Sequence, residues 1–193
     1  RRLLLFLPLA HVFARYMQFF CFAGNVSLGL SSNLKTILAD FKAFKPTFIL
    51  AVPRIFEKIY NAASQKAGAG FKGRVFADAT QTAYDWSHAQ QSGGSIPLAL
   101  NAKHALYNKL VYSSIMEVFG GHVEYAVSGG APLDSSIAHF FNGVGLPLLE
   151  GYGMTETCAP SSVNPTEGYK IGTIGLPLQG VTMGVGRRRG GCA

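Results

Sequence analysis

Residues 26–52 read VSLGLSSNLKTILADFKAFKPTFILAV, and this stretch decides the fold class. Its first and last segments, Val26–Leu30 and Thr47–Val52, are short apolar runs of the kind that form buried strands. Between them, Ser32 or Asn33 can cap a helix. The apolar residues of that helix recur at helical spacing and are Leu34, Ile37, Leu38, Phe41 and Phe44. A strand, a helix and a strand joined by short connections predict a parallel βαβ unit.

The same alternation extends to both sides of this unit. Before it lie an apolar run, Leu3–Leu7, and a helix with an aromatic face, His11–Ala23. After it, apolar periodicity predicts helices at Arg54–Ala67, Phe71–Gln90 and Pro97–Val118, then a strand at His122–Val127, a helix at Ser135–Asn142 and a strand at Pro147–Glu150. We therefore expect an α/β fold with a mostly parallel sheet and flanking helices.

Composition excludes several classes of protein. The chain has 193 residues, of which 48% are hydrophobic, so it is not intrinsically disordered, and its 23 glycines lack the period of a collagen-like repeat. The net charge of +7 suggests nucleic acid, but five of the 17 basic residues lie at the two ends. From Leu3 to Gly186 there are 12 Lys and Arg against 10 Asp and Glu, and their scatter argues against a nucleic-acid partner.

The cysteines and the apolar N-terminal run bear on the expected location. Three cysteines lie far apart without His/Cys clusters, so neither a zinc site nor a disulfide framework is indicated, and a reducing cytoplasm fits. The N-terminal run is apolar, but Pro8, His11, Arg15 and Gln18 interrupt it. Because an uncompensated arginine is costly inside a bilayer, we expect a buried strand and helix here instead of a membrane span.

Two loops that follow predicted strands carry the candidate chemistry, since open α/β sheets bind ligands at these strand ends. The first, SGGAP at residues 128–132, lets a flat ligand approach the backbone, although a glycine turn alone is more often only a turn. The second is GYGMTET at residues 151–157. There Tyr152 can stack on a base, Thr155 can bond a phosphate oxygen, and Glu156 offers Mg²⁺ a hard oxygen ligand. The alternative is a polar loop with a core tyrosine and a solvated glutamate.

GYGMTET, with SGGAPL at residues 128–133, resembles the adenylate-forming, or AMP-binding, superfamily of acyl-CoA synthetases, luciferases and peptide-synthetase adenylation domains. Two further segments, LLFLPLAHVFAR at residues 4–15 and AVPRIFEKIY at residues 51–60, are most similar to its long-chain fatty-acid CoA ligase branch. The resemblance covers residues 3–185, which is nearly the whole chain.

This resemblance implies roles for individual residues. The nucleotide pocket would be formed by Gly129, Gly130, Ala131, Gly151, Tyr152, Gly153 and Thr155. In it, Tyr152 would stack on adenine, Thr155 would bond the α-phosphate, and Glu156 would hold Mg²⁺ that bridges the ATP phosphates. His11 would lie beside the acyl carboxylate, which makes it, with Thr155 and Glu156, an implied catalytic residue. A histidine at a helix start is as often a packing residue, and that alternative stays open for His11.

The resemblance further implies an ATP-dependent reaction in two steps. A fatty-acid carboxylate attacks the α-phosphate of MgATP to give acyl-AMP and pyrophosphate, and coenzyme A then displaces AMP. The family's phosphate loop and its C-terminal domain with a catalytic lysine are not found in this sequence. We therefore expect residues 3–185 to be part of the large N-terminal domain of such an enzyme, inactive alone, and residues 186–193 to be a disordered or foreign tail.

Three alternatives remain open at this point. The chain could come from another adenylate-forming ligase, such as a fatty acyl-AMP ligase or an aryl-CoA ligase, or it could be a non-catalytic nucleotide-binding module. The aromatic helix His11–Ala23 could also contact a membrane surface, so peripheral contact with the inner face of the membrane stays open beside a cytoplasmic location. The expected partners are the small molecules fatty acid, ATP and coenzyme A, with no obligate protein partner.

Overall fold

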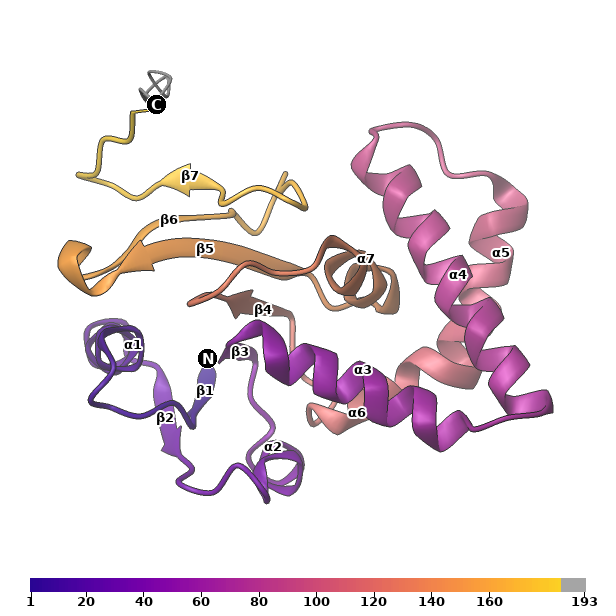
Figure 1. Ribbon diagram of the computed structural model, residues 1–193, viewed down its shortest axis with the longest axis horizontal. Coiled ribbons are helices and arrows are strands. Elements are labelled where there is room, and N and C mark those ends of the chain that lie inside the picture. The colour runs from indigo at the N-terminus through magenta and orange to yellow at the C-terminus, as the bar shows by residue number, and fades with distance from the viewer. Residues whose placement is uncertain (185–193) are drawn as a thin grey trace, which may run out of the picture.

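Within residues 1–184, which the computed structural model describes, seven strands form one sheet with helices on both faces (Figure 1). The strands are β1 (Arg2–Leu5), β2 (Ser27–Leu30), β3 (Phe48–Ala51), β4 (Tyr125–Ser128), β5 (Leu148–Met154), β6 (Ala159–Val163) and β7 (Leu176–Pro177). The α-helices are α1 (Val12–Ala23), α2 (Ile37–Phe44), α3 (Pro53–Ala67), α4 (Phe71–Gln91), α5 (Leu98–Tyr107), α6 (Ser113–Val118) and α7 (Ser135–Val144). The predicted tail, residues 186–193, lies outside the described residues.

The sheet is mostly parallel, which confirms the predicted fold class. Its strand order is β2-β1-β3-β4-β5-β6-β7, and the neighbouring pairs from β2 to β5 all run parallel. The chain reverses after β5, so β6 and β7 add two antiparallel pairings at one edge. The sequence did not predict these last two strands, because APSSV at residues 159–163 lacks an apolar or alternating pattern.

Alternate strand residues build two separate cores on the two faces of the sheet. Leu4, Ile49 and Ala126 belong to the larger core, which includes residues of α2, α3, α4, α6 and α7. Leu3 and Leu50 belong to the smaller core, under α1. In the sheet, β2 lies on one side of β1 and β3 lies on the other side, so the connections β1–α1–β2 and β2–α2–β3 run in opposite directions across the sheet. Because both crossovers have the same hand, α1 and α2 lie on opposite faces. Helix α1 therefore lies apart from the other helices (Figure 1).

The aromatic side of α1 is exposed, which corrects the expectation of a fully buried helix. The strand before it, β1, is buried from Leu3 to Leu5 as predicted. The helix itself packs through Ala14, Met17 and Cys21, because two of these three side chains are small and allow a close approach to the sheet. Phe19 and Phe22 lie on the other side and are 62% and 64% exposed, whereas Phe13 packs against the smaller core. No helix within residues 1–184 is long and apolar enough to cross a membrane.

Helix α2 begins later than its apolar spacing predicts. Ile37 is its first residue, and Thr36 stands at the N-cap without a side-chain capping bond. Neither predicted cap, Ser32 or Asn33, is therefore the N-cap, and Asn33 instead accepts a hydrogen bond from the Lys35 N–H at 2.9 Å. An asparagine that bonds the backbone two residues on forms a local turn, and this turn delays the helix.

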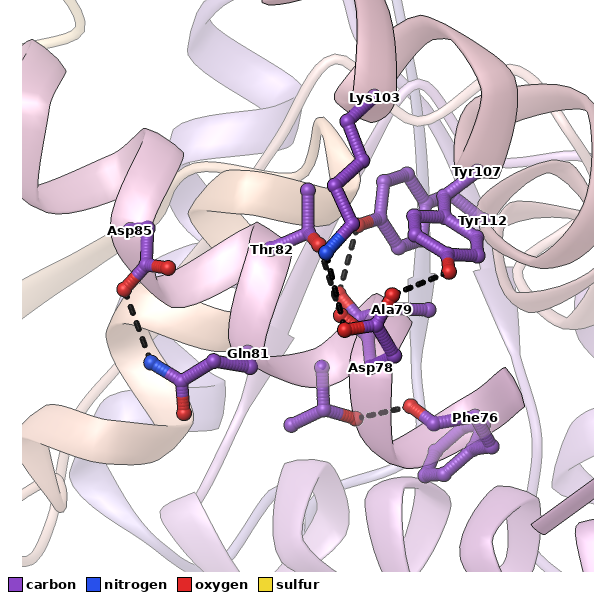
Figure 2. Close-up of polar contacts among 10 residues, drawn as sticks. Phe76, Asp78, Ala79, Gln81, Thr82, Asp85, Lys103, Tyr107 and Tyr112 are labelled. Carbon is purple, nitrogen blue, oxygen red and sulfur yellow. Dashed lines mark hydrogen bonds and ion pairs between the residues drawn. The ribbon is translucent and has the colours of Figure 1, made fainter. Parts of the chain in front are cut away.

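Residues 53–118 leave the sheet as a group of helices, as the sequence predicted. The predicted helix 97–118 is divided, because Asn108–Tyr112 form a π-helical turn between α5 and α6. The side chains of Lys103 and Tyr107 both donate to the Asp78 carboxylate, which joins α5 to α4 (Figure 2). These bonds, that of Tyr107 first, lower the pKa of Asp78. Half-exposed ion pairs contribute little stability, so this link fixes geometry more than it stabilises.

Helices α4 and α7 make the closest helix–helix contact of the fold. A Cβ atom added to Gly143 would lie 2.2 Å from the Ala83 carbonyl oxygen, so the two backbones touch there. Beside this point, the Asn142 amide donates to the Ser87 hydroxyl at 2.8 Å, and the Ser87 hydroxyl lies 2.9 Å from His139 Nδ1. The His139 ring stacks on that of His88, with centroids 3.7 Å apart.

This histidine pair makes stability depend on pH. Burial first, and then the charge of His88, lower the pKa of His139. The unfolded chain takes up this proton near pH 6.5, about the ordinary value for histidine, whereas the folded chain resists it. The contribution to stability is therefore complete above that pH and is lost as the pH falls toward the lower folded pKa. We expect the thermal midpoint to fall less between pH 7 and about pH 5.5 in His139→Gln than in the wild type; equal slopes by calorimetry would contradict this.

Candidate nucleotide and acyl site

A groove lies over the carboxyl ends of β4 and β5, where a parallel sheet binds ligands. Its volume is about 370 Å³. One wall is helix α1, the floor is formed by strands β3 and β4, and the other wall comes from the second half of β5, the turn that follows it and β6. The strand predicted to end at Glu150 thus continues to Met154, so most of the predicted GYGMTET loop is strand. The two predicted loops, SGGAP and GYGMTET, thus meet at one place with the start of α1.

One glycine of the GYG segment, Gly153, is required by the neighbouring strand. Gly151 and Gly153 lie on β5, and the pairing with β6 is irregular between Tyr152 and Gly153. A Cβ atom on Gly153 would lie 2.1 Å from the Ala159 carbonyl oxygen and 2.7 Å from the Pro160 Cα, so no side chain fits. Tyr152 between them is 40% exposed and lines the groove, which leaves its ring free to stack on a ligand.

The glycine turn after β4 is fixed from both sides. On the groove side, a Cβ on Gly129 would lie 3.1 Å from the Phe13 ring of α1. On the other side, the Glu150 carboxylate accepts the Leu133 N–H at 3.2 Å, which ties the turn to β5. Gly130 has φ +84°, a backbone conformation that favours glycine. The turn therefore presents backbone, without side chains, to the groove.

His11 is the N-cap of α1. Its Nδ1 accepts a weak hydrogen bond from the Phe13 N–H at 3.4 Å, and its side chain is exposed and lines the groove. A ring whose Nδ1 accepts a bond carries its proton on Nε2 when neutral, so Nε2–H is the donor that it offers to a ligand. The helix-start position thus gives this histidine a capping role and a free donor together.

The turn Thr155–Thr157 lies at the end of the groove next to the carboxyl ends of the strands, called here its upper end. The Thr157 hydroxyl holds it by accepting the Met154 N–H at 3.0 Å. Thr155 lines the groove, and the exposed side chain of Glu156 lies beside it. No cluster of three or more His, Cys, Asp or Glu side chains suited to a metal occurs in the described part of the chain. Glu156 is therefore a single carboxylate at this turn.

The structure brings seven of the nine predicted site residues into the lining of this one groove. These are His11, Gly129, Gly130, Gly151, Tyr152, Gly153 and Thr155. The other two, Ala131 and Glu156, are exposed and follow lining residues directly in the chain. Sequence reasoning missed the apolar lining, which includes Phe48, Leu50, Tyr125 and Val127. Their alternation along β3 and β4 was the available signal, but it does not tell which face of the sheet holds a ligand.

Comparison with known families agrees with this geometry. A family model described as AMP-binding enzyme matches residues 1–191. The chain belongs to this family. The resemblance that GYGMTET and SGGAPL carry is therefore confirmed over nearly the whole chain.

Similar curated proteins support the long-chain branch of this AMP-binding family. Long-chain-fatty-acid--CoA ligase FadD15 of Mycobacterium bovis is 48% identical over 179 residues, which cover 93% of this chain and 30% of that protein. Long chain acyl-CoA synthetase 3 of Arabidopsis thaliana is 34% identical, over 91% of this chain and 26% of that protein. The chain thus spans less than a third of the length of these relatives.

Solved structures share the fold of this AMP-binding chain. o-Succinylbenzoate CoA synthetase (MenE) from Bacillus subtilis, solved with the acyl-adenylate intermediate OSB-AMP, is similar with a TM-score of 0.57 and 18% identity, over 92% of this chain and 27% of that one. The N-terminal domain of FACL13 from Mycobacterium tuberculosis gives a TM-score of 0.52 at 18% identity, over 86% of this chain and 30% of that one. Both likenesses concern the fold alone.

Proposed function

We propose that this chain is part of an ATP-dependent long-chain fatty acid–CoA ligase and carries its adenine, α-phosphate and acyl subsites. The observation that carries the proposal is the convergence of GYG, SGG and His11 on one groove that continues over an apolar floor. The identity of 48% to a protein named as such a ligase supports the choice of branch. The whole reaction requires the rest of the enzyme.

The upper end of the groove suits a nucleotide. Tyr152 offers an exposed ring, and the bare backbone at Gly129 and Gly130 offers a flat opposite wall. Thr155 supplies a hydroxyl for the α-phosphate, and His11 supplies an Nε2–H for the acyl carboxylate. In this arrangement the carboxylate oxygen attacks the α-phosphorus in line and pyrophosphate leaves; the contribution of these residues is to position both reactants and stabilise the charge that develops.

The lower part of the groove suits an alkyl chain. Its side chains include Met17, Leu50 and Val127, which are apolar, and it joins the nucleotide end without a barrier of charged side chains among the lining residues. Burial of each methylene in such a groove favours binding by about 0.8 kcal/mol. The acyl-AMP so formed would then be attacked by the coenzyme A thiol, which releases AMP.

Glu156 fits the Mg²⁺ that the family implies. It is an exposed carboxylate next to Thr155, and Mg²⁺ typically binds one or two carboxylates together with substrate phosphates and water. When bound, the ion would neutralise charge on the ATP phosphates. Glu156 and those phosphates would provide its ligands.

Replacement of this carboxylate tests the proposal. In the full-length enzyme, we expect Glu156→Gln to lower fatty-acid-dependent ATP–pyrophosphate exchange at least tenfold, about 1.4 kcal/mol, because the amide keeps the shape but loses the charge. The apparent Mg²⁺ requirement should rise while the KM for the fatty acid stays constant. The matched control is Glu167→Gln, an exposed glutamate outside the groove. Unchanged exchange in Glu156→Gln would remove this residue from the site.

A further inference from the structure

The groove has a definite depth, which two elements give independently. Along α1 it extends from His11 to Phe20, nine residues that advance about 13 Å in a helix. Along β4 it extends from Gly129 back to Tyr125, four residues that also advance about 13 Å in a strand. Helix α1 follows β1 and runs antiparallel to the parallel strands β1, β3 and β4. The distances along α1 and along β4 are therefore measured along the same axis of the groove. The nucleotide end lies at His11 and Gly129, and the deep end lies at Phe20 and Tyr125.

A stacked aromatic pair forms the deep end. The Phe48 and Tyr125 rings lie 5.7 Å apart between centroids, with an interplanar angle of 18°. The two residues are also partners in the parallel pairing of β3 with β4, so the backbone fixes the stack. Phe48 is only 3% exposed, and the Arg1 guanidinium donates to the Tyr125 hydroxyl at 3.4 Å. The Tyr125 side chain is therefore held by the Phe48 ring, on which it stacks, and by Arg1, which bonds its hydroxyl.

On the floor of the groove, the residues between this pair and the nucleotide end are smaller. Val127 lies two residues nearer the nucleotide end on the same face of β4, and Leu50 holds the equivalent place on β3. Both side chains are smaller than the aromatic side chains of Phe48 and Tyr125, which lie deeper in the groove. On the floor of the groove, an extended alkyl chain that starts at His11 thus passes Val127 and Leu50 first and then meets the Tyr125 ring.

We propose that Tyr125, stacked on Phe48, is a specificity-determining residue that limits the straight part of the acyl site to about ten carbons. This inference rests on the proposed function. The number follows from the depth of about 13 Å and an advance of about 1.3 Å per carbon in an extended chain with C–C bonds of ~1.5 Å. A longer acyl chain has to turn at Tyr125, so this side chain decides how well chains beyond that length bind.

The test is a chain-length series in the full-length enzyme, with saturated fatty acids of 8 to 18 carbons and ATP–pyrophosphate exchange as the readout. In Tyr125→Ala, we expect the ratio of kcat/KM for hexadecanoate to that for decanoate to rise at least about tenfold, because about two more methylenes are buried straight ahead. Octanoate, which ends before the ring, should keep its wild-type kcat/KM. Tyr125→Phe, which keeps the ring, should keep the wild-type ratio. A folded Tyr125→Ala enzyme with the wild-type ratio would overturn the proposal.

A second variant keeps the proposal testable should Tyr125→Ala fail to fold. Val127→Phe places a ring about 7 Å nearer the nucleotide end, since two strand residues separate the positions. We expect it to lower exchange with octanoate as well as with decanoate and hexadecanoate at least about tenfold, because the remaining straight path of about 6 Å holds only about five extended carbons. Unaltered exchange with all three acids would count against a straight acyl path along β4. Failure of the wild-type enzyme to use any fatty acid would instead refute the proposed function, so the two failures are distinguishable.

Discussion

Gly153→Ala should lower ATP–pyrophosphate exchange in the full-length enzyme by at least about 100-fold, or about 2.7 kcal/mol of barrier. The added Cβ would lie 2.1 Å from the Ala159 carbonyl oxygen and 2.6 Å from its carbonyl carbon. Both atoms belong to backbone, so no side chain can turn away to make room. Strand β5 must move from β6, and Tyr152 and Thr155, on either side of Gly153, move with it. A displacement of about 1 Å in positioning groups is enough for an effect of this size.

The control for this prediction is Gly94→Ala. Gly94 has no atom within 4 Å of an added Cβ, so the same change of composition is made in open space. Exchange should stay at the wild-type level there, and circular dichroism should show that both variants fold. Tight nucleotide binding and normal exchange in Gly153→Ala would mean that the β5–β6 hairpin can open without moving the site.

The parallel half of the fold was predictable because its strands are short apolar runs, although only the inner ones are buried; β2, at the edge of the sheet, is partly exposed, which corrects the expectation of a buried strand there. Residues 48–51 are all buried, and their sequence FILA shows it directly. The antiparallel edge was not predictable in this way. In β6 the buried residues include Ser161 and Ser162, whose hydroxyl donates to the Ile174 carbonyl at 2.9 Å. Burial of a hydrogen-bonded serine leaves no apolar signal in the sequence.

In the candidate site, too, some residues were predictable from the sequence and others were not. The motif residues were predictable since glycine, tyrosine, threonine and glutamate at fixed spacing match a family pattern. The apolar floor of the groove was not, because Tyr125 and Val127 are residues that any strand uses. Only the geometry shows that α1 packs through Ala14 and Met17 and thereby leaves room beside it over β4.

Gly143→Ala should destabilise the protein by about 3 kcal/mol, against the sign that helix propensity predicts. An alanine within a helix is favoured over glycine by about 1 kcal/mol. At Gly143, however, the added Cβ would lie 2.2 Å from the Ala83 carbonyl oxygen and 2.6 Å from its Cα. Helices α4 and α7 must separate, and separation also lengthens the Asn142–Ser87 hydrogen bond that is now 2.8 Å. Overpacking alone costs about 1–3 kcal/mol, and the lost bond between buried groups adds about 1 kcal/mol or more.

This destabilisation is measurable as a fall in the thermal midpoint of roughly 6–12 °C, given about 2–4 °C per kcal/mol for a domain of this size. The same substitution in open space, Gly94→Ala, is the reference, and it should leave the midpoint within about 1 °C of the wild type because surface changes have small effects. Since Gly143 lies far along α7 from the groove, exchange activity below the midpoint should persist in the variant. A midpoint that rises in Gly143→Ala would mean that propensity outweighs the contact, and that α4 and α7 can move apart without loss.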